Sequence, residues 1–482
     1  MVVVRREGDG YNSEGDDEIE HFKNKEKTGL GLLTASAFFY PFEDSDCQKA
    51  SNSTACSPPQ LQVFLFFFSL YVVALAQGGH KPCVQAFGAD QFDEQDPIEC
   101  KAKSSFFNWW YFSFSAGILV VLTVLNYIQD NLGWGLGFGV PCIVMCLALI
   151  IFFLGTKTYR FRAHSDDINP FIRIGQVFVR AVRNWQTNPT AISTEEEAQG
   201  ILAHEGIQQF KFLNKALVMP DGSKKDGRVC SIDDIEEAKA VLRLVPIWAT
   251  SLVYAIVFAQ VSTLFTKQGV TMDRKITSSL QIPPASLQSF VTIAIVTVLP
   301  IYDCILVPVA RAITRKPSGI SMLQRIGIGI FFAMLSMVAA AIVENKRLEI
   351  AIEHGLVDTP KATVPMSVWW LIPQYLFFGV ADVFTMVGLQ EFFYDQAPGE
   401  LKSVGISLYL SIFGIGSFLS SFLISVIEKT TSRNGHTSWF ADNLNRAHFD
   451  YFYWLLAGLT AASLIVHIYF SRSYIYNRKL VI

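Results

Sequence analysis

The stretch ALAQGGHKPCVQAFGADQFDEQD, residues 74–96, continues an apolar run that begins near Leu61. A run of roughly 20 mostly apolar residues is long enough for a helix that crosses a bilayer. Gly78, Gly79 and then Lys81 follow within the same stretch. Two interpretations stay open. Lys81 could end the span and reach the headgroups, or the helix could continue and place the ammonium group deep among other helices, which the glycines favour because they allow close helix contact.

The whole chain has the composition of a membrane protein. Of its 482 residues, 51% are hydrophobic and 17% are charged, and the mean hydropathy is +0.32. Continuous apolar runs indicate helices, because the strands of a membrane barrel alternate polar and apolar residues. Nine such runs are predicted to span, at 61–82, 105–126, 135–155, 241–265, 287–310, 322–343, 367–393, 403–427 and 450–471. The expected fold class is an all-α membrane protein.

A long polar stretch divides these spans into two blocks. Lys and Arg gather after the third span, between the fifth and sixth, and at the chain end, so these connections are predicted to be cytoplasmic. The polar stretch carries an amphipathic pattern around residues 195–217. The expected organisation is a disordered cytoplasmic N-terminus (1–27), the remainder of a first helical bundle (28–155), a cytoplasmic linker with this amphipathic helix (156–239) and a second, six-helix bundle (240–482).

The same arrangement places residues 43–60 on the outer side of the membrane. Asn52 begins an Asn-Ser-Thr sequon and is a candidate for glycosylation. Cys47 and Cys56 flank it and are a candidate disulfide pair.

Asp382 is the clearest ionisable group inside a predicted span. It lies in LIPQYLFFGVADVFTMVGLQEFFYDQAP, and insertion of a charged side chain at such a depth costs about 2.5–3.5 kcal/mol. Burial favours the protonated carboxyl, which could release its proton when water or a cation approaches. That behaviour suits a proton-coupled carrier, and the alternative is an acid hydrogen-bonded to a neighbouring helix for packing.

Other polar or aromatic features of the spans have simpler interpretations. Glu391 and Asp395 are expected to have structural roles, and Asp303, with prolines on both sides, could stabilise a kinked helix. The cluster FFNWWYF, residues 106–112, is typical of an aromatic belt at the membrane interface.

The sequence contains no nucleotide-binding loop, metal-ligand cluster or nucleophile elbow. An enzyme is therefore not expected, and neither is a cofactor or a bound metal. The net charge of −3 gives no indication of a nucleic-acid partner.

Five long strings together resemble the plant nitrate/peptide transporters, of the proton-coupled oligopeptide transporter superfamily within the major facilitator fold. They are GGHKPCVQAFGADQFDEQD, LRLVPIWATSLVYAIVFAQVSTLFTKQGVTMDR, IPPASLQSF, LPIYDCILVPVAR and LQEFFYDQAPGELKS. The resemblance runs from about residue 28 to the end of the chain. It implies two bundles of six helices around a central cavity.

The resemblance also implies roles for individual residues. Lys81 corresponds to the fourth-helix lysine that faces the cavity, and Asp382 replaces the usual tenth-helix Glu of proton or substrate handling. Ser115 falls at the fifth-helix pocket, and Gln260 belongs to the seventh-helix lining. Phe258 stands where a nitrate transporter of the family has its nitrate-binding histidine, so a nitrate site built on that imidazole is not expected.

One family motif is missing. The Glu-x-x-Glu-Arg motif of the first helix, whose acids pair with the fourth-helix lysine, does not occur in the chain. The chain is therefore expected to lack the first two to three helices of the first bundle, with residues 28–155 matching the end of the third helix to the sixth, and residues 240–482 matching the seventh to the twelfth.

The predicted function is proton-coupled symport of a small solute, such as nitrate, a di- or tripeptide or a related metabolite. The expected partners are this solute, protons and the lipid bilayer, and the expected location is the plasma or vacuolar membrane of a plant. The alternative is a shortened, transport-inactive chain that serves as an interaction or regulatory subunit or has no function.

Overall fold

The computed structural model describes residues 24–35, 60–93, 96–125, 128, 133–160, 170–185, 209–217, 232–275, 281–314, 319–360, 362–432 and 438–476. Asn52, Cys47 and Cys56 lie outside these ranges, as does most of the predicted amphipathic segment 195–217.

The described elements are almost all helical. Residues 24–35 form a helix. The α-helices that follow are α2 (Gln60–Asp90), α3 (Pro97–Val120), α5 (Trp134–Gly155), α6 (Pro170–Arg183), α8 (Lys211–Asn214), α9 (Ile232–Ser262), α10 (Leu264–Val270), α11 (Ser289–Ile301), α12 (Val307–Thr314), α13 (Met322–Glu353), α14 (Ile372–Asp395), α15 (Lys402–Thr431) and α16 (Phe449–Arg472). The 3₁₀ turns are η2 (Thr156–Thr158), η6 (Lys215–Leu217), η7 (Pro284–Gln288), η9 (Val368–Leu371) and η10 (Gly399–Leu401), and the π-helical turns are η1 (Val121–Leu125) and η8 (Tyr302–Leu306). Strands β1 (Met272–Asp273) and β2 (Val364–Ser367) pair in parallel.

The chain divides into two compact units, which are described separately. The first comprises residues 1–106 and 113–163, and the second comprises residues 107–112 and 164–482. In the first unit, helix 24–35 packs on α2 so closely that a Cβ at Gly29 would collide with Val73. This helix begins within the segment for which disorder is expected.

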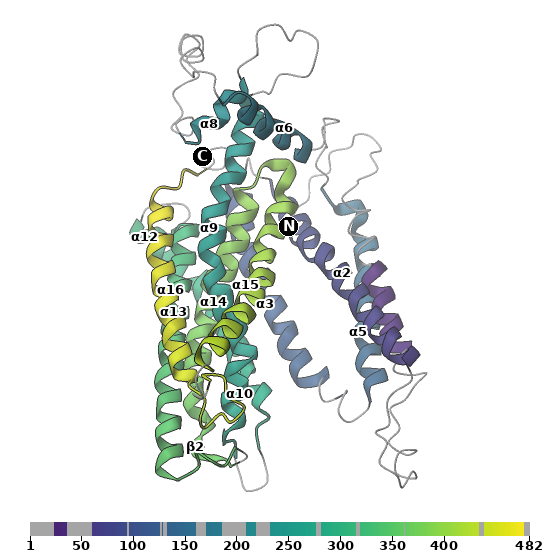
Figure 1. Ribbon diagram of the computed structural model, residues 1–482. Helices are drawn as coiled ribbons and strands as arrows, with labels where there is room; N and C mark the ends of the chain where they lie inside the picture. Colours follow the sequence, from purple (N-terminus) through teal and green to yellow (C-terminus); the bar gives the residue numbers. More distant parts are fainter. Residues whose placement is uncertain are drawn as a thin grey trace. The chain divides into compact units, whose positions relative to one another are not determined.

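In the second unit, α14 is the central helix. It packs against α11, α13 and α15, while α13 also contacts α16, and α9 contacts α15 and α16 (Figure 1). Nearly every residue of α14 from Phe378 onward is buried. A helix that is buried on all sides by other helices forms the core of a bundle.

Two glycines allow the helices of the second unit to approach closely. A Cβ at Gly329 on α13 would collide with Thr385 on α14, and a Cβ at Gly416 on α15 would collide with Ala255 on α9. Small residues at such contacts are typical of helix packing in membranes, where van der Waals contact replaces the hydrophobic effect.

Prolines and π-turns interrupt several helices. Pro246 lies inside α9 and Pro300 inside α11. Asp303 is on the π-helical turn η8, which begins two residues after Pro300. The irregular helix predicted around this aspartate is therefore present, because proline removes a backbone donor and the register shifts to a wider turn.

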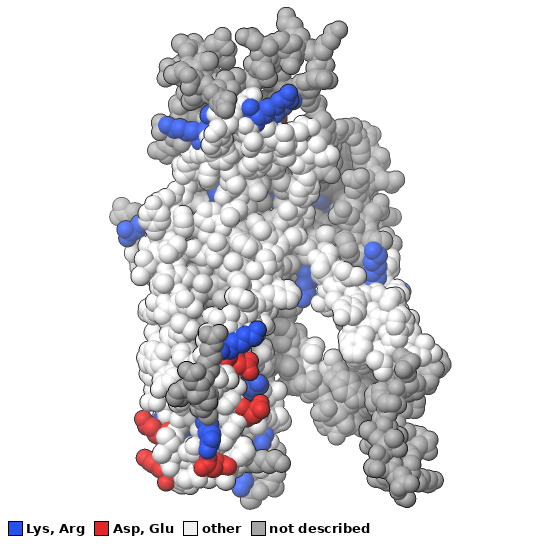
Figure 2. Space-filling model, in the orientation of Figure 1, with Lys and Arg blue, Asp and Glu red and all other residues white. Residues whose placement is uncertain are grey.

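Eight described helical segments are long and apolar enough to cross a membrane: Val63–Asp90, Gly135–Gly155, Asp233–Val270, Pro284–Thr314, Met322–Glu353, Val368–Asp395, Lys402–Thr431 and Phe449–Arg472. They match eight of the nine predicted spans; the ninth, 105–126, is helical over residues 105–125 in α3 and η1 but is not among these eight. Figure 2 shows charged residues gathered at the two ends of the second unit, with a largely uncharged band between them. The all-α membrane fold is confirmed.

The polar stretch between the blocks contains a helix that the sequence analysis did not predict. Helix α6, Pro170–Arg183, packs on the first turns of α9. Of the predicted segment 195–217, the described part forms α8 and η6. Helix α9 itself begins at Ile232, inside the stretch predicted as linker.

Candidate functional site

Asp382 is held between two tyrosines inside the second unit. Its side chain is 3% exposed. The Tyr111 hydroxyl donates to Oδ2 at 2.6 Å, and the Tyr254 hydroxyl donates to Oδ1 at 2.7 Å. Within the described part of the chain, no Lys, Arg or His forms an ion pair with this carboxylate. A buried acid is thus paired with neutral donors.

Three helices position this cluster. Asp382 is on α14, Tyr254 on α9 and Tyr111 in the part of α3 that belongs to the second unit. The Tyr254 ring stacks on Phe378, with centroids 6.0 Å apart and planes 10° apart. Because Phe378 lies one helical turn before Asp382, this stacking fixes the phenol beside the carboxylate.

Further polar side chains continue along the same helix. Thr385, one turn after Asp382 on α14, is buried. Gln390 donates to the Tyr409 hydroxyl at 3.0 Å, and Tyr409 in turn contacts Met386 at 3.5 Å. These uncharged groups extend the cluster on α14 beyond Asp382, and they add hydrogen-bonding capacity without a compensating positive charge.

Two effects act in opposite directions on the protonation of the Asp382 carboxyl. Burial disfavours the ionised carboxylate, because the charge leaves water. Two phenol donors favour the same ionised form, because hydrogen bonds to a charged acceptor are among the stronger ones in proteins. Proton exchange by Asp382 stays a prediction, and these two opposing effects are its physical basis.

Gln260 lies on α9, fully buried in the second unit. Its Nε2 donates to the Ile256 carbonyl and to the Ser420 hydroxyl, each at 2.8 Å. Its Oε1 is buried without a hydrogen-bond partner among the described residues. Phe258, two residues earlier, packs against Phe413 with ring centroids 5.1 Å apart. An aromatic contact therefore occupies the position at which the family's histidine was considered.

Lys81 belongs to the first unit, on a helix that continues to Asp90. Of the two interpretations, the structure shows the continuous helix, and the Lys81 side chain is exposed. Its positive charge interacts with Glu26. Glu26 also accepts from Gln77 at 3.2 Å and lies 2.9 Å from Nδ1 of His80. Glu26 therefore pairs with His80, and its interaction with the charge of Lys81 is the weaker one.

Ser115, the fourth predicted residue, is buried on α3 within the first unit. Lys81 and Ser115 therefore fall in the first unit, while Asp382 and Gln260 fall in the second.

A second polar network joins α3, η8, α13 and α14. Asn108 donates to Oδ1 of Asp303 at 2.7 Å, and Trp109 donates to Oδ2 at 3.1 Å. Arg325 donates to Asn108 at 2.7 Å and lies 3.7 Å from Glu391. Asp303 and Glu391 thus have hydrogen-bonded or ionic partners, as the structural interpretation of these acids expects.

Sequence reasoning missed Tyr111, Tyr254, Arg325 and Glu26. Tyr111 lies in the cluster interpreted as an interface belt, yet it is 4% exposed, whereas its neighbour Trp109 is 43% exposed. The belt interpretation is wrong for Tyr111, because its side chain points into the second unit. The sequence did contain a signal for Tyr111: it is a tyrosine in an apolar run. A buried tyrosine hydroxyl needs a hydrogen-bond partner, and a buried aspartate can supply one.

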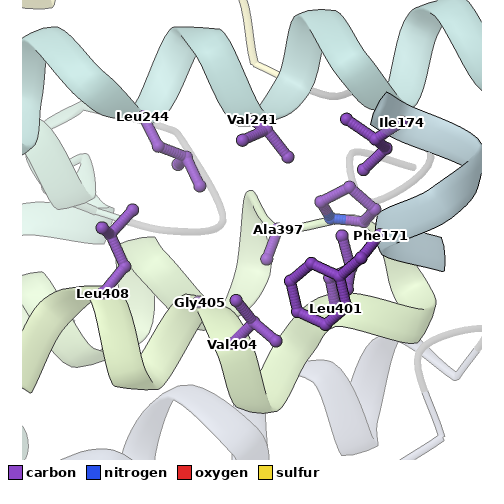
Figure 3. Close-up of a pocket in the computed structure, with 10 residues that line it drawn as sticks. Phe171, Ile174, Val241, Leu244, Ala397, Leu401, Val404, Gly405 and Leu408 are labelled. Atoms are coloured by element: carbon purple, nitrogen blue, oxygen red, sulfur yellow. The ribbon is translucent and has the colours of Figure 1, made fainter. Parts of the chain in front are cut away.

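The pocket in Figure 3 has a different chemistry. It is a cavity of about 120 Å³ between α6, α9 and the start of α15. Its lining is apolar: Phe171, Ile174, Val241, Leu244, Ala397, Pro398, Leu401, Val404, Gly405 and Leu408. A charged solute would lose its hydration there without compensation, so this pocket is not a candidate for a polar substrate.

Comparison with known proteins gives consistent results. The model of the POT family (PTR2) matches residues 28–440. The chain is 61% identical over 450 residues to Protein NRT1/ PTR FAMILY 5.10 of Arabidopsis thaliana, covering 93% of this chain and 79% of that relative. Among solved structures, the POT family transporter PepTSo superposes with a TM-score of 0.61 at 19% identity, over 95% of this chain and 84% of that one. An auto inhibited POT family peptide transporter gives 0.58 at 20% identity, over 96% and 85%.

Proposed function

We propose, from the premise that the chain belongs to the POT family of membrane transporters, that it is a proton-coupled symporter of a small anionic or zwitterionic solute in a plant membrane. The family is one of transporters and not of enzymes. The observation that carries the proposal is the buried Asp382 carboxylate between the hydroxyls of Tyr111 and Tyr254.

In the proposed cycle, Asp382 takes up a proton and later releases it. The neutral acid suits the buried state, and the anion is stabilised by the two phenols when the proton leaves. Coupling of solute to proton needs a group whose charge changes during the cycle. When this group is protonated, the bound solute experiences a different electrostatic potential than when it is ionised. Rocking of two helical bundles would expose this site alternately to each side.

Lys81 is proposed to attract the negative end of the solute. Glu26, which pairs with His80, adds a negative charge near this lysine. Ser115 and Gln260 are proposed to line the route, where the buried Oε1 of Gln260 offers an acceptor to a solute donor. A peptide carries both a carboxylate and an ammonium group, and nitrate offers only the anion. The proposed location is the plasma or vacuolar membrane.

Uptake into proteoliposomes tests the proposal. The purified chain is assayed with labelled nitrate and labelled dialanine, each with and without an inward proton gradient. We expect the gradient to accelerate uptake of at least one probe and to acidify the lumen as the probe enters. Uptake at the same rate with and without the gradient would reject coupling, and uptake of neither probe would favour the transport-inactive alternative.

The Lys81→Ala variant distinguishes a lysine that attracts the solute from one that only reaches the lipid headgroups. If Lys81 attracts the solute, the variant should raise the KM for the transported anion by about tenfold, which corresponds to about 1.4 kcal/mol of lost attraction. Lys429→Ala is the matched control, since Lys429 is an exposed lysine in the last turn of α15. Equal KM values in both variants would remove Lys81 from the site.

A further inference from the structure

Helix α6 is firmly attached to the start of α9. Arg173 of α6 lies 3.2 Å from Asp234 and 2.5 Å from Glu237, both on the first turns of α9. Beneath these ion pairs is an apolar cluster of Ile174, Val177, Ala181, Leu213, Ala216, Ile235, Ala238 and Leu401. One face of α6 is therefore fully used by contacts within the second unit.

The length of α9 indicates where α6 lies relative to the membrane. Its 31 residues extend about 47 Å at roughly 1.5 Å per residue, whereas the hydrocarbon core is about 30 Å thick. The first turns carry Asp233, Asp234, Glu236 and Glu237, so this end of α9 projects beyond the hydrocarbon. Figure 1 shows α6 lying across this end of the second unit. The helix is thus at the level of the headgroups, on the side predicted to be cytoplasmic.

A second face of α6 is apolar and exposed. Phe171, Ile172, Val179 and Val182, here called the apolar stripe, are 58%, 54%, 67% and 65% exposed. At about 100° per residue they fall within an arc of about 100°. Large apolar side chains gathered on one exposed strip indicate a surface that meets something other than water.

The third face of α6 is basic. Arg183 lies beside the apolar stripe, in the last turn of the helix, and its side chain is exposed. Trp185 follows at 61% exposure, and the Lys215 ammonium group is 5.5 Å from the centre of its ring. Apolar residues flanked by arginine and tryptophan are typical of helices in the interfacial plane of a membrane.

The apolar pocket of Figure 3 continues this surface. Phe171 belongs both to the apolar stripe and to the pocket lining, and Leu401 and Val404 line the pocket from the side of α15. The pocket suits acyl-chain carbons, since its lining offers no charged partner to a headgroup.

We propose that α6 is an interfacial helix that binds anionic phospholipid in the cytoplasmic leaflet. The apolar stripe enters the edge of the acyl-chain region, and Arg183 contacts the lipid phosphate, because guanidinium groups pair with phosphate in a bidentate geometry. The inference does not depend on which solute is carried, and it assigns a lipid contact to the linker between the two helical blocks.

Photocrosslinking in a bilayer tests this contact. The full chain carries benzoylphenylalanine at Val179 or Val182 and is placed in nanodiscs of phosphatidylcholine with a minority of phosphatidylglycerol. Intact-protein mass spectrometry after illumination identifies each adduct by mass. We expect phospholipid adducts at both positions, with the share of phosphatidylglycerol several-fold above its share in the bilayer. The same probe at Ile465, an exposed position within the α16 span, should give the bilayer share.

Arg183 is tested in the same assay. In Arg183→Gln, lipid adducts at Val182 should persist while the phosphatidylglycerol share falls to the bilayer value. Lys429→Gln should leave the share unchanged. Crosslinks to the chain itself or to a second copy at both probe positions would overturn the proposal, as would a phosphatidylglycerol share equal to the bilayer value in the unsubstituted protein. Loss of the enrichment on addition of inorganic phosphate would show a free-phosphate site and would also overturn it.

Discussion

Asp382 and its two phenols carry the chemistry of the candidate site at the scale of single residues. The sequence could predict the aspartate, because one charge in a long apolar run is costly and therefore conspicuous. It could not predict Tyr111 and Tyr254, because these residues come from helices far away in the chain and meet Asp382 only through tertiary packing. The same reason hid Glu26, whose relation to Lys81 depends on how helix 24–35 packs against α2.

Tyr254→Phe tests the role of the phenols. The variant keeps the ring that stacks on Phe378 but removes one donor to the carboxylate. A hydrogen bond to a charged group contributes about 1.5–3 kcal/mol, equivalent to about one to two pH units. Since the anion loses a donor, the protonated acid is favoured, and the pH profile of gradient-driven uptake should move to higher pH. Tyr451→Phe, at an exposed tyrosine of α16, is the control, and an unshifted profile in Tyr254→Phe would assign the phenol to packing.

At the scale of elements, close helix contacts hold the second unit together. The contact between α15 and α9 depends on Gly416, where any side chain would collide with Ala255. The sequence indicated which segments are membrane-spanning helices, because the length of each apolar run can be compared with the thickness of the bilayer. The prediction missed α6, whose arginines lower its mean hydropathy below that of a span, although apolar residues recur at helical spacing within it.

Gly416→Leu should destabilise this helix pair. Overpacking of a tight contact typically lowers stability by about 1–3 kcal/mol, so the Tm of the detergent-solubilised protein should fall by several degrees. Gly414→Leu is the matched control, because Gly414 is on the same helix and a Cβ there meets nothing within 4 Å. Equal Tm values for the two variants would contradict the packing described for α15.

Glu99 and Arg160 join the start of α3 to the segment after η2 in the first unit, with guanidinium–carboxylate distances of 2.7 and 3.2 Å. Hydrogen bonds from Arg160 and from the Asp93 amide lower the pKa of the Glu99 carboxyl from its usual 4.5. A lowered pKa means that the pair stabilises the fold above pH 4.5 and that this contribution is lost as the pH falls through the lowered pKa.

Glu99→Gln should therefore lower the Tm slightly at neutral pH, by the small amount typical of an exposed ion pair. The difference from the unsubstituted protein should disappear in acid. Thermal unfolding in detergent across a pH series measures both values, with Glu428→Gln as an exposed control on α15. A Tm difference that persisted in acid would exclude the ionised carboxylate as its source.

At the scale of the whole molecule, the spans and the family resemblance were predictable, since both depend on long local strings. The end of α2 was not predictable from hydropathy. The helix continues past Pro82, through polar residues, to Asp90. The membership of residues 107–112 in the second unit was not predictable either. It depends on the contacts that Asn108, Trp109 and Tyr111 make with Asp303 and Asp382.

The central claim is that the Asp382 carboxyl carries the coupled proton. The most direct measurement compares two modes of transport by Asp382→Asn in proteoliposomes, using the probe solute that the unsubstituted chain carries. Exchange of labelled for unlabelled solute needs no net proton movement, whereas accumulation against a gradient does. The account predicts that Asp382→Asn retains exchange and loses proton-driven accumulation. Accumulation by the variant to the level of the unsubstituted protein would contradict it.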